Sequence, residues 1–207
     1  MALDEARQVR QFWFGALPIS AQELQRREQL WFGGPPELRH QCDELIGARF
    51  AGMIERAARG ELASWADSPR RRLSLIILLD QFPRNIYRGT ARAFAYDSQA
   101  LGLALSGMQS AADGALDVVE RIFFYMPLQH AEVREVQDES VAAYRRLLTE
   151  APPQLRGTFE SALQSAQLHR SLIEQFGRFP HRNRALGRSA TPDEETWLRE
   201  HPESLGQ

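Results

Sequence analysis

The chain has 207 residues, of which 43% are hydrophobic and 25% are charged, and its formal net charge at pH 7 is −2. This composition is typical of a globular protein and excludes a disordered chain, while the near-zero charge gives no general attraction to nucleic acid or anionic membrane. All 25 basic residues are arginine, which excludes Schiff-base chemistry on lysine and a P-loop lysine.

Two features of the sequence bear on the cellular compartment in which the protein is found. The single cysteine, Cys42, cannot form an intramolecular disulfide, which is typical of a protein from a reducing compartment. The charged N-terminus has no apolar signal-peptide region, and the longest apolar run, Leu75 to Leu79, is too short to span a bilayer. We therefore expect a cytoplasmic protein that makes no membrane contact.

Helix signals recur along the chain, whereas strand signals do not. Ser20 and Glu23 have the spacing of a capping box, and Thr191 with Glu194 forms a second one, with Pro192 at the first helical position. Glycines follow several apolar-periodic stretches, where they are typical of helix ends. These signals predict helices over residues 4–14, 20–32, 36–59, 69–81, 90–107, 114–125, 129–149, 155–177, 180–187 and 192–200.

The predicted helix over residues 69–81 has a special place in the expected fold. Its stretch from Leu73 to Leu79 is apolar on nearly all sides, which indicates a central helix that other helices surround. The short loops favour sequential helices packed as antiparallel hairpins. We therefore predict an all-α fold of stacked helical hairpins around this helix, with residues 1–207 in one domain.

The first segment with candidate chemistry follows the central helix. Asp80 lies at its apolar end, where a carboxylate is costly unless it is paired. Pro83 is expected to turn the chain there, with Arg84 and Arg88 within reach. A structural ion pair between Asp80 and an arginine and a functional site are equally compatible with this pattern. In the functional interpretation Asp80 is catalytic, and Arg84, Asn85 and Arg88 bind the ligand.

The second segment surrounds a further proline. Glu120 and Arg121 share helical faces with buried aromatic residues, so that both charged groups point partly inward. Pro127 is expected to interrupt the helix, and His130 then lies at the start of the next one. Buried salt bridges across a kink are the alternative to a site. We predict His130 as catalytic, and Glu120, Arg121 and Tyr125 as ligand-binding.

The third segment is rich in arginine and histidine. His169 faces the apolar side of its helix, a position that is usually structural, and His181 follows Pro180 at an expected helix start. Arginine at a helix N-terminus opposes the helix dipole, which favours an anion nearby. We predict His169 and His181 as catalytic. The predicted ligand-binding residues of this segment are Arg170, Arg178, Arg182 and Asn183.

Together the three segments offer groups for acid–base catalysis and for anchoring an anion. A divalent metal on Asp80, His130, His169 and His181 is a weaker alternative, because these residues lack the spacing of a known metal motif. The sequence has neither a serine nucleophile elbow nor a glycine-rich phosphate loop. No organic cofactor is therefore favoured.

The same segments carry a family resemblance. Residues 78–88 (LLDQFPRNIYR), 123–130 (FFYMPLQH) and 176–188 (FGRFPHRNRALGR) resemble the bacterial and fungal domain-of-unknown-function family 924. The likeness runs from Phe12 to about Glu195. It implies a tetratricopeptide-like all-helical fold, and it implies no established activity.

Three functions follow from these observations as hypotheses. The first is a ligand pocket or a cofactor-independent enzyme that acts on a small polar or anionic molecule, with His/Asp acid–base chemistry and arginine anchoring. The second is a helical-repeat module that binds an acidic peptide or protein in a groove. The third is RNA contact through Arg170 to Arg188, with Phe176 and Phe179 as stacking groups, against which the net charge weighs.

Overall fold

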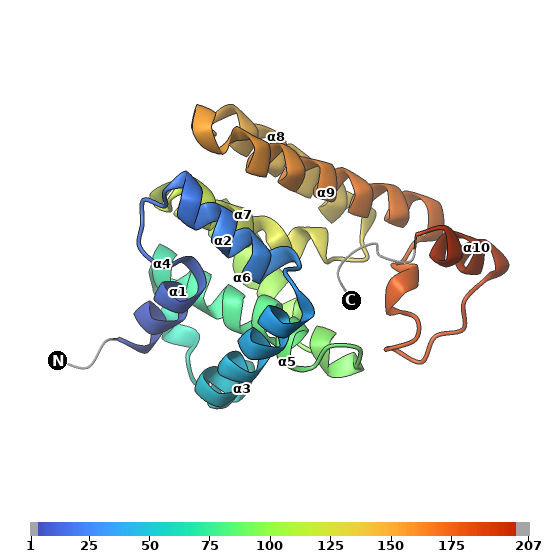
Figure 1. Ribbon diagram of the computed structural model, residues 1–207, viewed down its shortest axis with the longest axis horizontal. Coiled ribbons are helices and arrows are strands. Elements are labelled where there is room, and N and C mark those ends of the chain that lie inside the picture. Colours follow the sequence, from blue (N-terminus) through green and yellow to red (C-terminus); the bar gives the residue numbers. More distant parts are fainter. Residues whose placement is uncertain (1–3, 202–207) are drawn as a thin grey trace.

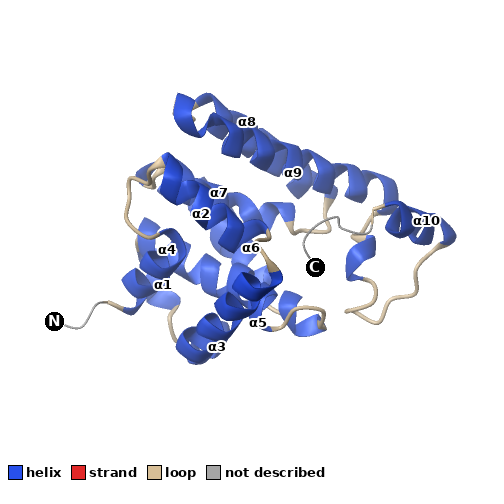
Figure 2. Ribbon diagram, viewed as in Figure 1, coloured by secondary structure: helices blue, strands red, loops and turns tan. Residues whose placement is uncertain are grey.

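The computed structural model describes residues 4–201, and within this range it contains helices and loops but no strand (Figure 1, Figure 2). The all-α prediction is confirmed, while the tetratricopeptide-like repeat arrangement stays a prediction. The α-helices are α1 (Glu5–Phe14), α2 (Ala21–Phe32), α3 (Pro36–Ala58), α4 (Pro69–Ile76), α5 (Phe82–Ile86), α6 (Asp97–Gln109), α7 (Val118–Gln129), α8 (Arg134–Thr149), α9 (Arg156–Phe176) and α10 (Pro192–Glu200). Shorter elements are η1 (Ala63–Asp67), the π-turn η2 (Ile77–Gln81), η3 (Ala91–Phe94), η4 (Ala112–Ala115), η5 (Pro153–Leu155) and η6 (Pro180–Arg182).

The centre of the fold is a rod made of α4, η2 and α5 in sequence. All residues from 73 to 83 are buried, as the apolar pattern predicted. α1 packs across α4, where the Ser74 hydroxyl donates to the Ala6 carbonyl at 2.7 Å. Edge-to-face contacts of Trp13 with Phe82 and Phe123 join α1, α5 and α7. The rod is thus enclosed by helices from both halves of the chain.

The rod does not end at Pro83, which corrects the predicted turn. Phe82 has helical angles, and the coil continues to Ile86. The π-turn explains the continuity, because the Phe82 N–H bonds to the Ile77 carbonyl five residues back, just before a proline that has no N–H to offer. The predicted helix over 69–81 is therefore part of a longer, locally widened helix.

A second proline correction concerns α7. The helix runs through Pro127 to Gln129, and His130 ends it instead of starting the next helix. Gln137 on α8 explains this end, since its buried Nε2 donates to the carbonyls of Leu128, Gln129 and Ala131 at 3.1, 2.7 and 2.7 Å. The carbonyls at the helix end are therefore satisfied by a residue from another helix.

Two further predicted helices are shorter in the structure. Residues 90–107 split into η3 and α6, because Tyr96 departs from helical angles (φ −113°, ψ 9°) between them. Residues 180–187 form only η6 and a turn that ends at Gly187 with φ +64°. The splitting at Tyr96 places Asp97 in the first turn of α6.

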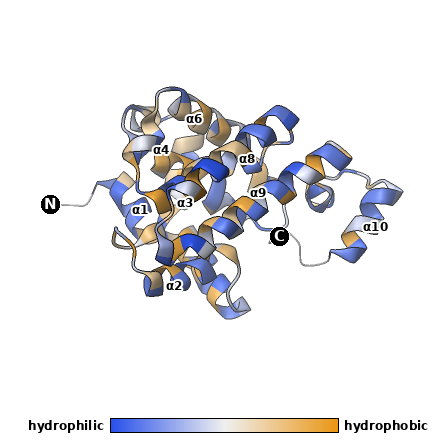
Figure 3. Ribbon diagram, turned by 90° about the horizontal axis from the view of Figure 1, so that it is seen from above, coloured by the Kyte–Doolittle hydropathy of each residue, from blue (hydrophilic) through white to orange (hydrophobic). Residues whose placement is uncertain are grey.

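α8 and α9 lie side by side along one edge of the molecule, and η6 and α10 extend beyond them at the C-terminal end (Figure 1, Figure 3). This end has its own small apolar cluster of Leu172, Ile173, Phe179 and Trp197, separate from the main core. Within residues 4–201, no helix is long and apolar enough to cross a membrane.

Candidate functional site: a buried Asp–His–Arg cluster

Asp80 and His130 form a buried pair between η2 and the end of α7. The Asp80 side chain is fully buried, and its Oδ1 lies 2.7 Å from Nδ1 of His130. Gln81 donates to the second carboxylate oxygen, and Nη1 of Arg84 lies 3.3 Å from Oδ1. Because the carboxylate accepts at Nδ1, neutral His130 carries its proton there and its lone pair on Nε2.

Two arginines and Asp97 extend this pair toward α6 and η6. Arg84 binds Asp97 through two contacts of 2.8 Å and donates to the Asp80 carbonyl at 2.6 Å. Nη1 of Arg182 donates to Asp97 at 3.1 Å. Asp97 thus links Arg84 of the central rod to Arg182 of η6, which lies 85 residues after Asp97 in the chain.

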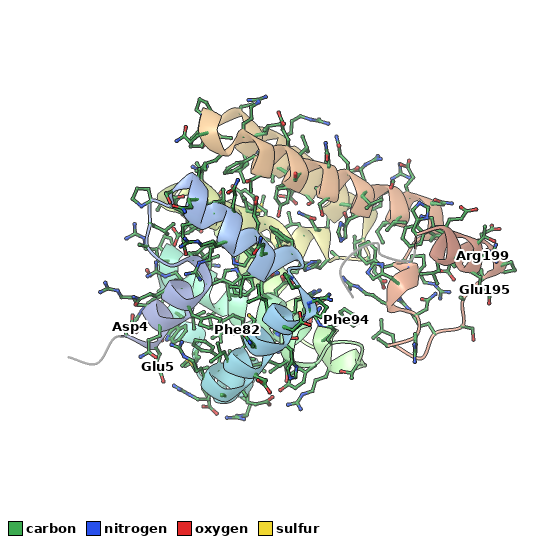
Figure 4. The ribbon with its side chains drawn as sticks, viewed as in Figure 1. Asp4, Glu5, Phe82, Phe94, Glu195 and Arg199 are labelled. Atoms are coloured by element: carbon green, nitrogen blue, oxygen red, sulfur yellow. The ribbon has the colours of Figure 1, made fainter. Side chains whose placement is uncertain are left out.

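Aromatic rings surround the charged groups. The Arg182 guanidinium lies 4.6 Å from the ring centre of Phe94 and 4.7 Å from that of Phe179, and both contacts have cation–π geometry. Phe94 lies on the side of the body that faces the C-terminal helices, opposite the end that carries Asp4 and Glu5 (Figure 4). The rings hold the arginine in a fixed direction.

Three histidines lie in sequence across this site. The ring centres of His130 and His169 are 6.1 Å apart, and Phe179 lies 5.4 Å from both His169 and His181. Nδ1 of His169 donates to the Ser165 carbonyl at 2.8 Å, which leaves the lone pair of this ring on Nε2. The site therefore contains at least two imidazoles whose tautomer is fixed by the fold.

Burial and the arginine charges keep these imidazoles neutral. Burial, helped by the positive charge of Arg84, lowers the pKa of His130 in spite of its Asp80 partner. The pKa of His169 is lowered to about 3 by burial and by His130, and that of His181 to about 3 by burial and by Arg182. At neutral pH each of the three rings is therefore uncharged and keeps one nitrogen lone pair that can accept a hydrogen bond.

The carboxylates and guanidiniums stay charged. Burial alone would raise the pKa of Asp80, but Arg84 and His130 outweigh it and hold this pKa well below its usual range. Burial and the charge of Arg84 lower the pKa of Arg182 to about 10, which leaves it protonated at neutral pH. Asp80, Asp97, Arg84 and Arg182 therefore balance each other as two anions and two cations.

The cluster retains polar capacity that the described residues do not use. Nδ1 of His181 and Nε of Arg182 are buried without a hydrogen-bond partner among residues 4–201. The side chains of His130 and Arg84 are each 13% exposed, and that of Asp97 is 20% exposed. A partly accessible cluster with unpaired donors and acceptors fits a ligand better than a closed structural network does.

Asp80, Arg84, His130, His169, His181 and Arg182 are thus the predicted site residues that the structure brings together. Others from the first two segments lie elsewhere. Asn85 and Arg88 contact Asp43 on α3, with the Asn85 amide at 2.9 Å. Away from the cluster, Glu120 caps α7 and pairs with Arg10, Arg121 pairs with Glu150, and Tyr125 bonds to Asp113.

Most of the third segment also serves the scaffold. Arg170 pairs with Asp138 and Glu174, and Arg178 pairs with Glu194, which also accepts from the Asn183 amide. The prediction that these residues bind the ligand has no geometric support. Phe179 is fully buried, so the stacking role given to it in the RNA hypothesis is wrong.

Sequence reasoning missed Asp97, Phe94 and Gln137. Asp97 was expected inside a continuous helix, and Phe94 carried no pattern of its own. The Asp–Ser pair after Tyr96 was the available signal, because Asp is favoured in a first helical turn. For metal binding, no group of three or more His, Cys, Asp or Glu side chains in residues 4–201 is arranged to hold an ion.

Comparison with known proteins matches nearly the whole chain. The family described as bacterial protein of unknown function, DUF924, matches residues 9–202. A solved structure of a protein of unknown function from Agrobacterium tumefaciens is 34% identical, with a TM-score of 0.77, and the match covers 94% of this chain and 97% of that chain. No curated protein matches the chain. Neither description assigns a substrate or a reaction.

Proposed function

Since this chain belongs to the DUF924 family of bacterial proteins of unknown function, its chemistry has to be argued from its own residues, and we propose an acid–base site for a small anionic molecule. The site comprises Asp80, His130, His169, His181 and Arg182, with Arg84 and Asp97 in support. The reaction needs no organic cofactor in this proposal.

His130 is the proposed general base. Asp80 accepts from Nδ1 of His130, so Nε2 is the nitrogen that takes a proton from a bound molecule. The imidazolium that forms is stabilised by the Asp80 carboxylate beside it, while Arg84 keeps that carboxylate ionised. Asp80 is therefore a positioning residue that acts through His130.

Arg182 is the proposed anion anchor. Its Nη1 is used by Asp97, but its buried Nε has no partner, and two aromatic rings hold the guanidinium in place. A carboxylate or phosphate oxygen at Nε would make a charge-assisted hydrogen bond. His181, next to it in the chain, contributes a second polar atom without a partner, Nδ1.

One observation carries the proposal. The fully buried Asp80 carboxylate fixes the tautomer of His130. Two further neutral histidines lie nearby, together with an arginine that has an unused N–H group, and all of these groups come from η2, the end of α7, α9 and η6. A purely structural ion pair requires neither the additional imidazoles nor unpaired buried atoms.

The test is a thermal-shift screen of anionic metabolites, followed by calorimetry and assays on the compounds that stabilise the protein. His130→Gln removes the base and keeps an amide that can face Asp80. We expect it to abolish turnover, or to weaken binding at least tenfold, with a melting temperature within a few degrees of the unaltered protein.

His40→Gln is the matched control, because the His40 side chain is 75% exposed and pairs with Glu44 on its own helix. This variant must behave as the unaltered protein. A ligand that binds and reacts equally well with His130→Gln and with Arg182→Gln would contradict the proposed site.

A further inference from the structure

A cleft that includes none of the residues of the Asp–His–Arg cluster lies at the N-terminal end of the central rod. It has a volume of about 770 Å³ and is formed by α1, the loop after it, α2 and the start of α4. The residues that line it are Arg7, Arg10, Gln11, Gly15, Ala16, Leu17, Arg27 and Arg70. This volume lies within the range of about 300–1,000 Å³ that is usual for small-molecule sites.

The lining carries a positive charge that the protein only partly neutralises. Four of the lining residues are arginine and none is acidic. Arg10 contacts Glu120 at a long 3.4 Å, and Arg27 binds Glu23 at 2.8 Å. Arg7 and Arg70 have no ion pair among residues 4–201, so the cleft keeps two uncompensated positive charges.

The nearest acidic residues of α1 are bound to other partners. Asp4 accepts from Arg71 at 3.1 and 3.2 Å, and Glu5 accepts from Arg56 at 2.8 Å. Neither carboxylate therefore pairs with Arg70 at the start of α4. Asp4 and Glu5 thus pair with arginines that do not line the cleft, while Arg7 and Arg70 have no ion pair among residues 4–201.

The scaffold beneath the cleft is firmly held. The Arg27 guanidinium donates to the Phe12 carbonyl at 2.6 Å and lies so close to Gly15 that an added Cβ would meet it at 2.8 Å. Gly15 also has φ +72°, which disfavours other residues. Arg27 is thereby positioned before any ligand arrives, which lowers the entropic cost of binding.

Arg10 gives an independent sign of a missing partner. Its side chain is 19% exposed, and its Nε is buried without a hydrogen-bond partner. Buried donors are nearly always satisfied in folded proteins, so this arginine of the cleft lining keeps hydrogen-bonding capacity that residues 4–201 do not use.

We propose that this cleft binds a small molecule that carries at least two anionic groups, phosphate or carboxylate. The two uncompensated arginines determine the expected charge of the ligand, because a dianion would neutralise both of them. Guanidinium suits both oxyanions, since its paired N–H groups match two oxygens of a phosphate or carboxylate. The volume leaves room for an organic part between or beside the anionic groups.

This cleft is distinct from the proposed acid–base site. Arg70 and Asp80 are ten residues apart on the same rod, which corresponds to about 15 Å at 1.5 Å per residue. The Asp–His–Arg cluster has no excess charge, whereas the cleft has. The two sites can therefore be tested separately.

Isothermal titration calorimetry with pyrophosphate and with citrate tests the proposal and distinguishes the two anion classes. We expect at least one of them to bind with a dissociation constant below 1 mM at low salt, as the opposed charges favour, and to bind more weakly as salt is added. The double variant Arg7→Gln/Arg70→Gln is expected to weaken this binding at least tenfold.

Arg145→Gln is the matched control, because Arg145 is an exposed arginine on α8, away from the cleft. It must leave the affinity unchanged, as must His130→Gln. Absence of binding by both anions, equal binding by the double variant, or loss of binding in His130→Gln would each overturn the proposal.

Discussion

At the scale of single residues, the most unusual feature is the number of uncharged imidazoles held beside charged groups. His169 and His181 each have a pKa lowered to about 3, mainly by burial. Their ordinary value is about 6.5. The folded protein therefore binds fewer protons at these rings than the unfolded chain does whenever the pH lies between about 3 and 6.5.

This difference predicts acid sensitivity with a defined sign. The free energy of unfolding is highest above pH 6.5 and falls as the pH drops below this value, because the two rings bind protons in the unfolded state but not in the folded state. For His169 the slope approaches about 1.4 kcal/mol per pH unit within this window. The pH dependence of the free energy of unfolding can be measured by urea denaturation of the unaltered protein and of His169→Gln between pH 7 and pH 5.

His169→Gln is expected to flatten the pH dependence, and His40→Gln, on an exposed histidine, is expected to leave it as it is. An unchanged slope in His169→Gln would show that the pKa of this ring is the same in the folded and unfolded states.

Some of these residues were predictable and others were not. Asp80 and His169 were indicated as inward-facing groups because local helical spacing places them beside apolar residues, and both are buried. Asp97 was missed because its importance comes from Arg84 and Arg182, 13 and 85 residues away. Tertiary pairing over such distances leaves no local pattern. Arg178 was overestimated for the same reason, since its partner Glu194 belongs to another helix.

At the scale of elements, two prolines lie inside helical segments that were expected to end before them. Pro83 follows the π-turn, and Pro127 lies in the last turn of α7. Sequence rules treat proline as a break because they count only local hydrogen bonds. Here the π-turn accommodates Pro83, whereas the Gln137 side chain binds the carbonyls at the end of α7, just after Pro127. The second of these compensations depends on α8 and was not visible in the sequence.

Gln137 is accordingly predicted to fix the end of α7 and, through it, His130. Gln137→Leu leaves buried carbonyls of Leu128 and Gln129 without their side-chain donor. We expect the free energy of unfolding to fall by about 1–3 kcal/mol in urea denaturation, the usual cost of an unsatisfied buried group. A ligand of the proposed site should also bind more weakly.

The matched control is Gln99→Leu, because Gln99 is exposed and its side-chain amide donates to the Ala58 carbonyl at the surface. Its effect on stability is expected to be small. Equal effects of the two substitutions would contradict the special role of Gln137.

At the scale of the whole molecule, the proposed acid–base site lies where a small apolar cluster meets the main core. Phe179 belongs to the small cluster, whereas Asp80 and His130 are set by the main body. Glu132 joins the two parts, because it accepts from the Phe179 N–H at 2.8 Å and pairs with Arg188 at 2.8 Å. The C-terminal segment therefore supplies half of the site from a separately stabilised unit.

Trp197→Ala is predicted to loosen that unit and leave the main core folded. The Trp197 ring packs against Phe176 and His201 at one side of the small cluster. Its removal should speed tryptic cleavage after Arg184 and Arg188 several-fold, while the main thermal transition moves by only a few degrees.

A comparison of amide hydrogen exchange rates in α10 and in α7 also tests whether the small cluster loosens independently of the main core. Leu168→Ala, on an exposed apolar side chain of α9, serves as the control and should change neither reading. Cooperative loss of both regions in Trp197→Ala would mean that the two clusters unfold together.

The π-turn also constrains how the length of this chain can vary. The π-turn holds one residue more per turn than an α-helix does, and it lies between Arg70 at the start of the rod and the part of the rod where Asp80 meets His130. Deleting a single residue there would restore regular winding and rotate Asp80 by about 100° around the axis relative to Arg70. Substitutions along the rod preserve this relation, whereas a shortened rod would turn the carboxylate away from His130. The direction of Asp80 relative to Arg70 therefore depends on the number of residues between them as well as on their identity.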